Sequence, residues 1–442
     1  MSSTIDSKYE DQINLNLDTS RIMTFDVIRG LAILLMVLFH AVIHTLDISS
    51  FVDDQKNVDL STIPPIFFPV LIIIFILATW DSLFLLISVM VNMVSFHGRL
   101  KNGNKLESIL MNKIKWGAVL MALGYLFNIL FSFDALIINI FSAETASETI
   151  RAQVLNFYAL QIIGLSLIIS SLILYFFYKT QWFTNWRQQI TLLLGLLVIM
   201  IILSPIITAS LEHIFPGLPS KRWTDSKEFA LSMILTVFIG TPQPLFPYII
   251  TAITGMIFGI LIIQPDLKPK FAKFMYSGAG IGFILLALLL FSGNTLSLTF
   301  YRPDVTYVIF ELSGQLFFIA LFYQLIEGRE VRSGVFHHLR LWSIYGLSIY
   351  MLQAIEIFPR TLILLIFGQK LTVQPLYSIP IALLVTISVY FMWTQIIKLW
   401  NGGAYHYTVE HFISEVFGFN ITSRLSLVNL DESIMESSSS SN

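Results

Sequence analysis

Four ionisable side chains follow one face of an apolar segment near the start of the chain. Asp26, Arg29, His40 and His44 fall within a sector of about 80° when residues 24–46 are drawn as a helix. Ionisable groups inside an apolar span are unfavourable and usually face other helices. The pattern predicts a polar seam, with Arg29 and His40 about 16 Å apart along the axis. An anchoring role for the first two and ordinary buried contacts for the histidines remain open.

A second apolar segment repeats this periodicity. Asp81, Ser88, Asn92 and Ser95 share one helical face. We expect this face to meet the seam, so that Asp81 would orient an imidazole and leave its other nitrogen to act as a base. Hydrogen bonds that only join two helices are an equal alternative.

Polar residues also occur in later apolar segments. Gln353, Glu356 and Arg360 share a face, and the i,i+4 spacing of the last two predicts an ion pair within one helix. Three further residues could line a cavity or join helices by hydrogen bonds, namely Gln161, Glu311 and Gln315.

Apolar windows of about 20 residues, the length that crosses a bilayer as a helix, define the elements that must position these groups. The ten candidate spans are residues 24–46, 64–95, 111–132, 153–178, 188–210, 245–264, 273–292, 305–326, 341–366 and 376–399. The apolar stretch 229–240 is short and runs into Pro242 and Pro244, so it reads as a re-entrant or interfacial piece. An eleventh span stays open.

The basic residues predict the orientation of these spans. With the N-terminus in the cytoplasm, 18 of the 26 Lys and Arg residues lie in the segments placed inside. We therefore expect both termini to be cytoplasmic. The predicted organisation is a polar N-terminus (1–23), a helical bundle (24–400) and a cytoplasmic tail (401–442) with a disordered Ser-rich end.

The composition excludes most other classes of protein. Of 442 residues, 55% are hydrophobic and 12% are charged, whereas soluble domains carry about 25% charged residues. The net charge of −2 offers no general attraction for nucleic acid. The chain has no cysteine, so disulfides, thiolate metal sites and cysteine nucleophiles are excluded, and we expect no metal. The sequence predicts an all-α integral membrane protein of about ten transmembrane helices.

The first polar segment also resembles a known motif. Asp26-x-x-Arg29-Gly30, an apolar run and then His40, eleven residues after the Arg, resemble the first core span of the transmembrane acyltransferase superfamily. That superfamily includes the acyltransferase-3 proteins and the heparan-alpha-glucosaminide N-acetyltransferase-like proteins. Weaker matches lie at residues 80–88, 155–164, 244–255 and 348–353, with Val89 where Gly usually follows and Gln353 where His is common.

The resemblance implies an acyl-CoA-dependent membrane acyltransferase, expected to transfer an acetyl group from the cytoplasmic side. The acceptor would be an amine or hydroxyl on a glycan or lipid-linked sugar. The catalytic group would be His40, as base or transient acyl carrier, assisted by Arg29 and Asp81. The remaining roles would be donor binding by Arg29, Arg99 and Lys101, and acceptor binding by Asp26, His44, Gln161 and Gln353.

Other functions use the same residues. The seam could serve as the proton relay of a transporter or flippase, and a non-catalytic relative would tolerate substitution of His40. The expected partners are the lipid bilayer of the cell membrane, acyl-CoA and the sugar acceptor, with no nucleic acid, and a homodimer stays open.

Overall fold

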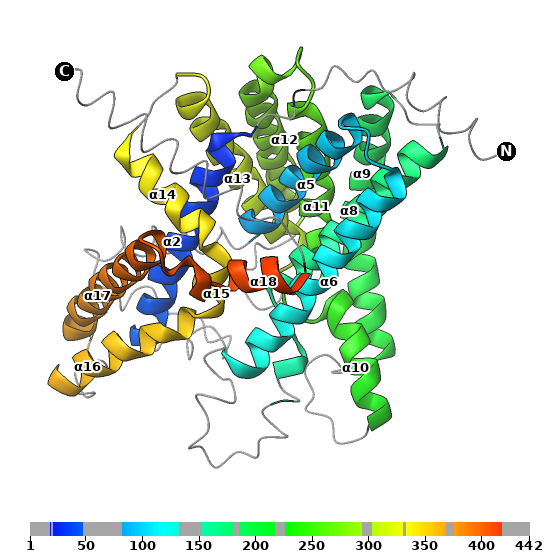
Figure 1. Cartoon of the computed structure of the whole chain (residues 1–442). Coiled ribbons are helices and arrows are strands. Elements are labelled where there is room, and N and C mark those ends of the chain that lie inside the picture. The colour runs from blue at the N-terminus through cyan, green and yellow to red at the C-terminus, as the bar shows by residue number, and fades with distance from the viewer. Residues whose placement is uncertain are drawn as a thin grey trace, which may run out of the picture. The chain divides into compact units, whose positions relative to one another are not determined.

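The structure, a computed structural model, is almost entirely helical in the part that it describes (Figure 1). It describes residues 18, 21–46, 82–131, 150, 153–180, 185–216, 226–293, 303–329, 333–367 and 375–417. Within these residues nine helices are long and apolar enough to cross a membrane. The chain is therefore an all-α, multi-pass membrane protein. The predicted tail beyond residue 417, Asp81 and the N-terminal part of the predicted span 64–95 lie outside the described residues.

The chain divides into two compact units, each of which is described by itself. Unit 1 comprises Met1–Phe25 and Thr79–Val331, and unit 2 comprises Asp26–Ala78 and Arg332–Asn442. The boundary falls within helix α2 (Met23–Leu46), whose three residues before Asp26 belong to unit 1. The polar segment that carries both histidines thus belongs to unit 2.

Unit 1 contains eight α-helices and a single short pair of strands among its described residues. In chain order its elements are α5 (Leu83–Lys101), α6 (Leu106–Leu130), β1 (Asn156–Phe157), α8 (Ala159–Thr180), α9 (Trp186–Ile214), α10 (Ser226–Ile239), β2 (Thr241–Pro242), α11 (Leu245–Ile262), η5 (Lys268–Lys270), α12 (Phe271–Phe291) and α13 (Val305–Ile326). Strands β1 and β2 pair in parallel, with Asn156 opposite Thr241. Helix α10 has 14 residues and ends before Pro242, as the prolines predicted.

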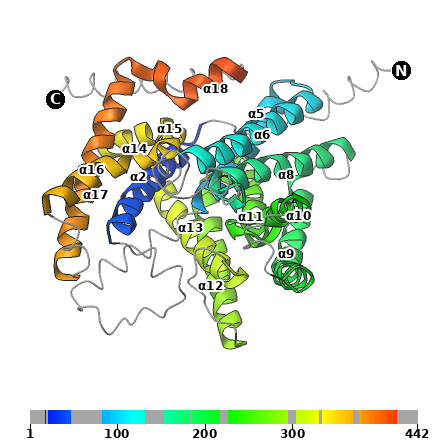
Figure 2. The ribbon, with the colours of Figure 1, turned by 90° about the horizontal axis from the view of Figure 1, so that it is seen from below.

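Helix α11 forms the core of unit 1, because nearly all of its side chains are buried. In both ribbon views it lies among other helices of this unit (Figures 1 and 2). It packs on α5, α8, α9 and α13. Small residues allow the closest approaches: a Cβ at Gly255 or Gly259 would press on the backbone or side chains of α5. Gly117 of α6 and Gly164 of α8 face each other in the same way.

Unit 2 contains the C-terminal helices in addition to most of α2. Its elements after α2 are α14 (Gly334–Ile344), α15 (Gly346–Met351), η6 (Gln353–Glu356), α16 (Ile357–Phe367), α17 (Pro375–Asn401), η8 (Ala404–Tyr407) and α18 (Val409–Phe417). Helices α16 and α17 pack side by side (Figure 2). The predicted continuous span 341–366 is wrong: three short helices and a 3-10 turn occupy it.

Gly30 marks a close approach between α2 and α14. A Cβ placed at Gly30 would lie 1.6 Å from the carbonyl oxygen of Leu339 and 3.2 Å from the backbone nitrogen of Ser343. Only a residue without a side chain allows the two backbones to come this close. The glycine of the Asp26-x-x-Arg29-Gly30 motif therefore has a packing role within unit 2.

A buried carboxylate connects α18 to α15. Glu410 Oε1 accepts hydrogen bonds from the backbone nitrogens of Leu347 (2.9 Å) and Ser348 (3.0 Å), and Oε2 accepts from the Ser348 hydroxyl. The Val409 nitrogen donates in return to Ser348 Oγ at 2.8 Å. An acceptor at the start of a helix satisfies backbone donors that have no partner in the helix.

The Glu410 carboxyl should give unit 2 a measurable pH dependence. Burial raises its pKa above the ordinary value of 4.5. Such a group contributes stability below the pKa of the unfolded chain, and the contribution is lost as the pH rises through the higher folded-state pKa. We expect wild type to lose stability relative to Glu410→Gln as the pH rises above about 4.5, measured by thermal unfolding in detergent. Parallel pH curves for the two proteins would contradict this assignment.

Candidate functional site

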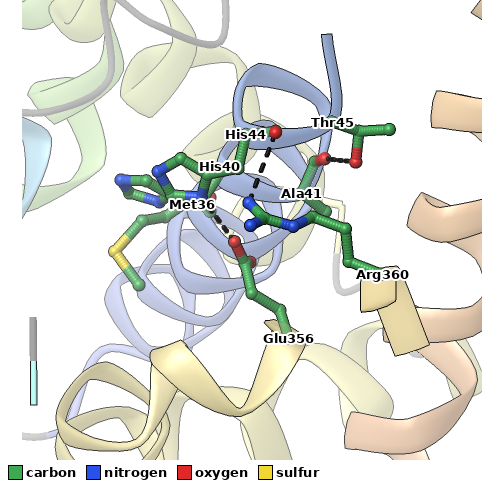
Figure 3. A network of polar contacts seen from close by, with 7 residues as sticks. All are labelled: Met36, His40, Ala41, His44, Thr45, Glu356 and Arg360. Carbon is green, nitrogen blue, oxygen red and sulfur yellow. Dashed lines mark hydrogen bonds and ion pairs between the residues drawn. The ribbon is translucent and has the colours of Figure 1, made fainter. Parts of the chain in front are cut away.

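Two imidazoles lie together in the C-terminal half of α2 (Figure 3). The rings of His40 and His44 stack with their centroids 5.6 Å apart. His40 Nδ1 lies 2.9 Å from the carbonyl oxygen of Met36. Because a carbonyl oxygen can only accept, the neutral His40 ring carries its proton on Nδ1 and its lone pair on Nε2.

A buried carboxylate lies against the second imidazole, that of His44. His44 Nδ1 lies 2.6 Å from Glu356 Oε1, and the Glu356 side chain is only 1% exposed. In Figure 3 the carboxylate of Glu356, on η6, points at the imidazoles of α2. A carboxylate in this position fixes the orientation of the ring and stabilises the imidazolium that forms when Nε2 takes a proton. The pair therefore has the geometry of a general base and its orienting group.

The Arg360 side chain, on α16, contacts the C-terminal end of α2. Its NH1 group donates to the His44 carbonyl oxygen at 3.3 Å. The last four carbonyls of a helix have no partner within it, and they form the negative end of its dipole. The guanidinium thus satisfies a backbone acceptor and complements the dipole beside the two imidazoles.

The predicted ion pair between Glu356 and Arg360 is wrong. These residues bind the ring and the backbone of His44 instead. The reason is local: Gln353–Glu356 is a 3-10 helix that precedes α16, so the α-helical i,i+4 geometry does not extend back to Glu356. Neither residue was among the predicted site residues, although their charges within an apolar segment were the available signal.

The other end of the predicted seam is a separate ion pair. Arg29 NH2 lies 2.7 Å from Asp26 Oδ1, in the first turns of α2. Among the described residues, the buried Arg29 Nε has no hydrogen-bond partner. Eleven residues of helix separate Arg29 from His40, which is about 16 Å along the axis. Helix α2 itself is confirmed, and it carries one polar group near each end.

The remaining predicted site residues have different surroundings. Gln353 begins η6, is buried, and its Oε1 has no partner within the described part of the chain. Gln161, in unit 1, is fully buried and accepts from the Tyr158 nitrogen at 3.2 Å, beside the start of α8. Arg99 and Lys101 are exposed in the last turn of α5, also in unit 1.

The polar face of α5 makes hydrogen bonds to α6 and α8 inside unit 1. Asn92 Nδ2 donates to Ser170 at 3.0 Å and Ser171 at 3.1 Å, both on α8. Ser95 accepts from Lys113 of α6 at 3.0 Å. The hydrogen bonds of Asn92 and Ser95 thus join helices of unit 1, which is the alternative left open for this face.

Two buried groups of α13 hold the start of α5. Glu311 Oε1 accepts from the Ser82 backbone nitrogen at 3.1 Å, and Gln315 Nε2 donates to Ser82 Oγ at 2.8 Å. A carboxylate at a helix N-terminus satisfies a free donor and complements the dipole. These contacts correspond to helix joining, the second of the two roles left open for Glu311 and Gln315.

The arrangement in unit 2 is thus a carboxylate, two stacked imidazoles and a guanidinium at one end of α2. Across the described ranges no group of three or more His, Asp or Glu residues is placed to hold a metal ion. The two imidazoles and the carboxylate are groups that can transfer protons, whereas the guanidinium stays charged. No protein-family model matches the chain, and no curated protein matches it.

Proposed function

We propose that the protein is a multi-pass membrane acyltransferase. It would move an acyl group, expected to be acetyl, from cytoplasmic acyl-CoA to an amine or hydroxyl of a glycan or lipid-linked sugar. The observation that carries the proposal is the His44–Glu356 pair at 2.6 Å, with His40 stacked on His44. The Asp26-x-x-Arg29-Gly30 motif and its spacing to His40 add the resemblance to membrane acyltransferases.

The proposed reaction needs a base that later acts as an acid. His44 Nε2 removes the proton from the acceptor amine or hydroxyl while that atom attacks the thioester carbonyl. The new N–C or O–C bond forms, the C–S bond breaks, and the proton passes to the thiolate of CoA. The Glu356 carboxylate stabilises the imidazolium between the two proton transfers. The resemblance implied His40 as the base and His44 as an acceptor contact; the proposal exchanges these two roles because Glu356 lies against His44. His40, stacked on His44, would orient the acceptor.

Basic residues would hold the acyl donor. Arg29 has a buried Nε–H without a partner among the described residues, and a guanidinium binds phosphate oxygens well. Arg99 and Lys101 remain proposed contacts for the donor's phosphates at the cytoplasmic side. The proposed location is the cell membrane, with both termini in the cytoplasm. The acceptor contacts expected for Asp26, Gln161 and Gln353, and the expected role of Asp81 in orienting an imidazole, remain part of the proposal.

Radiolabelled acetyl-CoA tests this function directly. Purified protein in nanodiscs is incubated with the label and a glucosamine-type acceptor, and product formation and CoA release are measured. We expect His44→Ala and His40→Ala to lower turnover by about 10²-fold or more, because the base or its neighbour is lost. Arg29→Ala is expected mainly to raise the KM for acetyl-CoA, since it removes a donor contact.

The same assay can reject the proposal. If wild type neither binds acetyl-CoA nor releases CoA with amine and hydroxyl acceptors, acyl transfer is excluded for this site. Label retained on wild type without acceptor, and lost in His40→Ala, would instead assign His40 as an acyl carrier.

A second function is favoured by one further feature of the site. Glu356, His44 and His40 form a row of titratable groups within an apolar protein, and such rows relay protons in transporters. A transporter or flippase would show proton movement into proteoliposomes that depends on Glu356 and needs no acyl-CoA. A Glu356-dependent proton flux in protein that is inactive with acetyl-CoA would select this alternative.

A further inference from the structure

An apolar groove lies between α8 and α9 in unit 1. Its volume is about 380 Å³, within the range of about 300–1,000 Å³ that is usual for ligand pockets. Every side chain that lines it is Leu, Ile or Phe; Leu172 and Phe176 come from α8, and Leu192 and Leu196 from α9. The groove therefore offers no hydrogen bond and suits a hydrocarbon chain.

The groove opens on a surface that a membrane would cover. Leu172, Phe176 and Leu192 are 45%, 50% and 41% exposed. Both helices are long and apolar enough to cross a bilayer, and α9 has few buried residues. A hydrocarbon chain that enters this groove can therefore come directly from the surrounding lipid.

Basic and aromatic side chains stand at one end of the groove. Lys179 Nζ lies 5.9 Å from the centroid of the Tyr175 ring, and the Arg187 guanidinium lies 5.3 Å from that of the Trp186 ring. Lysine, arginine, tyrosine and tryptophan are typical of the level where lipid headgroups begin. Arg187 is exposed, so its charge can meet a ligand.

The charges at this end have a positive balance. Lys179 donates to Glu107 at 3.0 Å, and both side chains are more than half exposed. Lys105, two residues before Glu107, is a further cation near this end. Among the described side chains named here, three cations, Lys105, Lys179 and Arg187, thus accompany the Glu107 carboxylate.

The spacing of the basic and apolar residues matches a lipid that lies along the helices. Lys179 follows Phe176 by three residues, about 4.5 Å of helix, and Arg187 precedes Leu192 by five, about 7.5 Å. Phe177, two residues before Lys179, also lines the groove, so both charges lie within about one and a half turns of it. The expected orientation places this end at the cytoplasmic leaflet, where anionic lipids attract basic residues.

We propose that the α8–α9 groove and its basic end bind one phospholipid with an anionic headgroup. An acyl chain fills the groove between Leu172, Phe176 and Leu196, and the phosphate lies near Lys179 and Arg187. This site is independent of the proposed acyl transfer, because none of its residues has a role in binding the donor or the acceptor or in proton transfer.

The test measures the binding of phosphatidylglycerol and phosphatidylcholine to the purified full-length protein. Both lipids are added to protein in detergent, and bound lipid is counted by native mass spectrometry with thermal unfolding as a second measurement. We expect phosphatidylglycerol to bind more tightly and to raise the unfolding temperature more. Arg187→Ala should weaken phosphatidylglycerol about fivefold, since one basic group near an anionic headgroup contributes about 1 kcal/mol. It should weaken phosphatidylcholine less, because the choline cation of that lipid already offsets the charge of its phosphate.

The groove itself is tested by a filling substitution and a matched control. Leu196→Trp places a large ring in the groove and should remove tight binding of both lipids. Val198→Trp adds the same side chain two residues further along α9, at a position that is 56% exposed and does not line the groove. The control variant should bind both lipids as wild type does.

Several results would overturn the proposal. Equal binding of both lipids to wild type would contradict recognition of an anionic headgroup. Unchanged lipid binding to a folded Leu196→Trp protein would contradict binding of an acyl chain in the groove. If Leu196→Trp does not fold, the groove is tested on wild type instead, by competition between phosphatidylglycerol and a soluble short-chain analogue for the same site. Absence of saturable competition would then exclude a defined site.

Discussion

Glu356→Gln is expected to lower the turnover number for acyl transfer by about 10²- to 10³-fold and to leave the KM for acetyl-CoA nearly unchanged. The amide has the shape of the carboxyl group and can still accept the hydrogen bond from His44 Nδ1, now 2.6 Å from Glu356. It has no charge, so it cannot stabilise the imidazolium that forms during the reaction. The substitution therefore removes the electrostatic stabilisation of the imidazolium and keeps the hydrogen bond that positions the His44 ring.

A second histidine–glutamate pair in unit 2 supplies the matched control. Glu415 lies 3.2 Å from His411 Nε2 on α18, and its side chain is 70% exposed. Glu415→Gln makes the same chemical change at a surface pair and should leave turnover within about twofold, since exposed ion pairs contribute little. Turnover and its pH profile, measured with labelled acetyl-CoA for both variants, give the comparison.

The outcome distinguishes a positioning residue from a merely structural one. A role in proton transfer predicts that Glu356→Gln changes the pH profile of the turnover number while the unfolding temperature changes little. A structural role predicts lower unfolding temperature and an unchanged pH profile in the protein that remains folded. Equal turnover of Glu356→Gln and Glu415→Gln would exclude Glu356 from the reaction.

The sequence predicted the helix that bears the site better than it predicted the partners of that helix. The periodicity of Asp26, Arg29, His40 and His44 correctly placed them on a single helix, because helical spacing is a local property. Glu356 and His44 are 312 residues apart, and nothing local records that they meet. The prediction also treated 341–366 as one helix, which directed Glu356 toward Arg360.

The interruption of the predicted helix 341–366 explains why the predicted and observed partners of Glu356 differ. Apolar composition was continuous over 341–366, so a window of about 20 residues predicted one span. The structure instead ends α14 at Ile344, begins α15 at Gly346 and adds a 3-10 turn before α16. Glu410 holds the start of α15 from a helix more than 60 residues away, a contact that hydropathy does not record.

Gly30→Ala is expected to be the most destabilising of three glycine-to-alanine changes. A methyl group at this position would clash with the Leu339 carbonyl oxygen, which is backbone and cannot rotate away. Helices α2 and α14 would have to separate, and overpacking of this kind costs about 1–3 kcal/mol or more. We expect a fall of several degrees in the unfolding temperature and less folded protein after purification.

Two other glycines form a graded comparison. A methyl group at Gly346 would meet only the end of the Ile33 side chain, which can change rotamer, so Gly346→Ala should cost less than Gly30→Ala. Gly195, within α9, has no atom within 4 Å of a Cβ, and alanine favours a helix over glycine by up to about 1 kcal/mol. Gly195→Ala should therefore be neutral or stabilising.

The order of the three variants decides whether the motif glycine is required for packing. Unfolding temperatures measured in one detergent by size-exclusion chromatography after heating should fall in the order Gly195→Ala, Gly346→Ala, Gly30→Ala. If Gly30→Ala is as stable as Gly195→Ala, the close approach of α2 and α14 is wrong. If it is destabilised as expected, Gly30 holds α14 against the turn that carries Arg29, and its place in the motif follows from packing rather than from contact with a substrate.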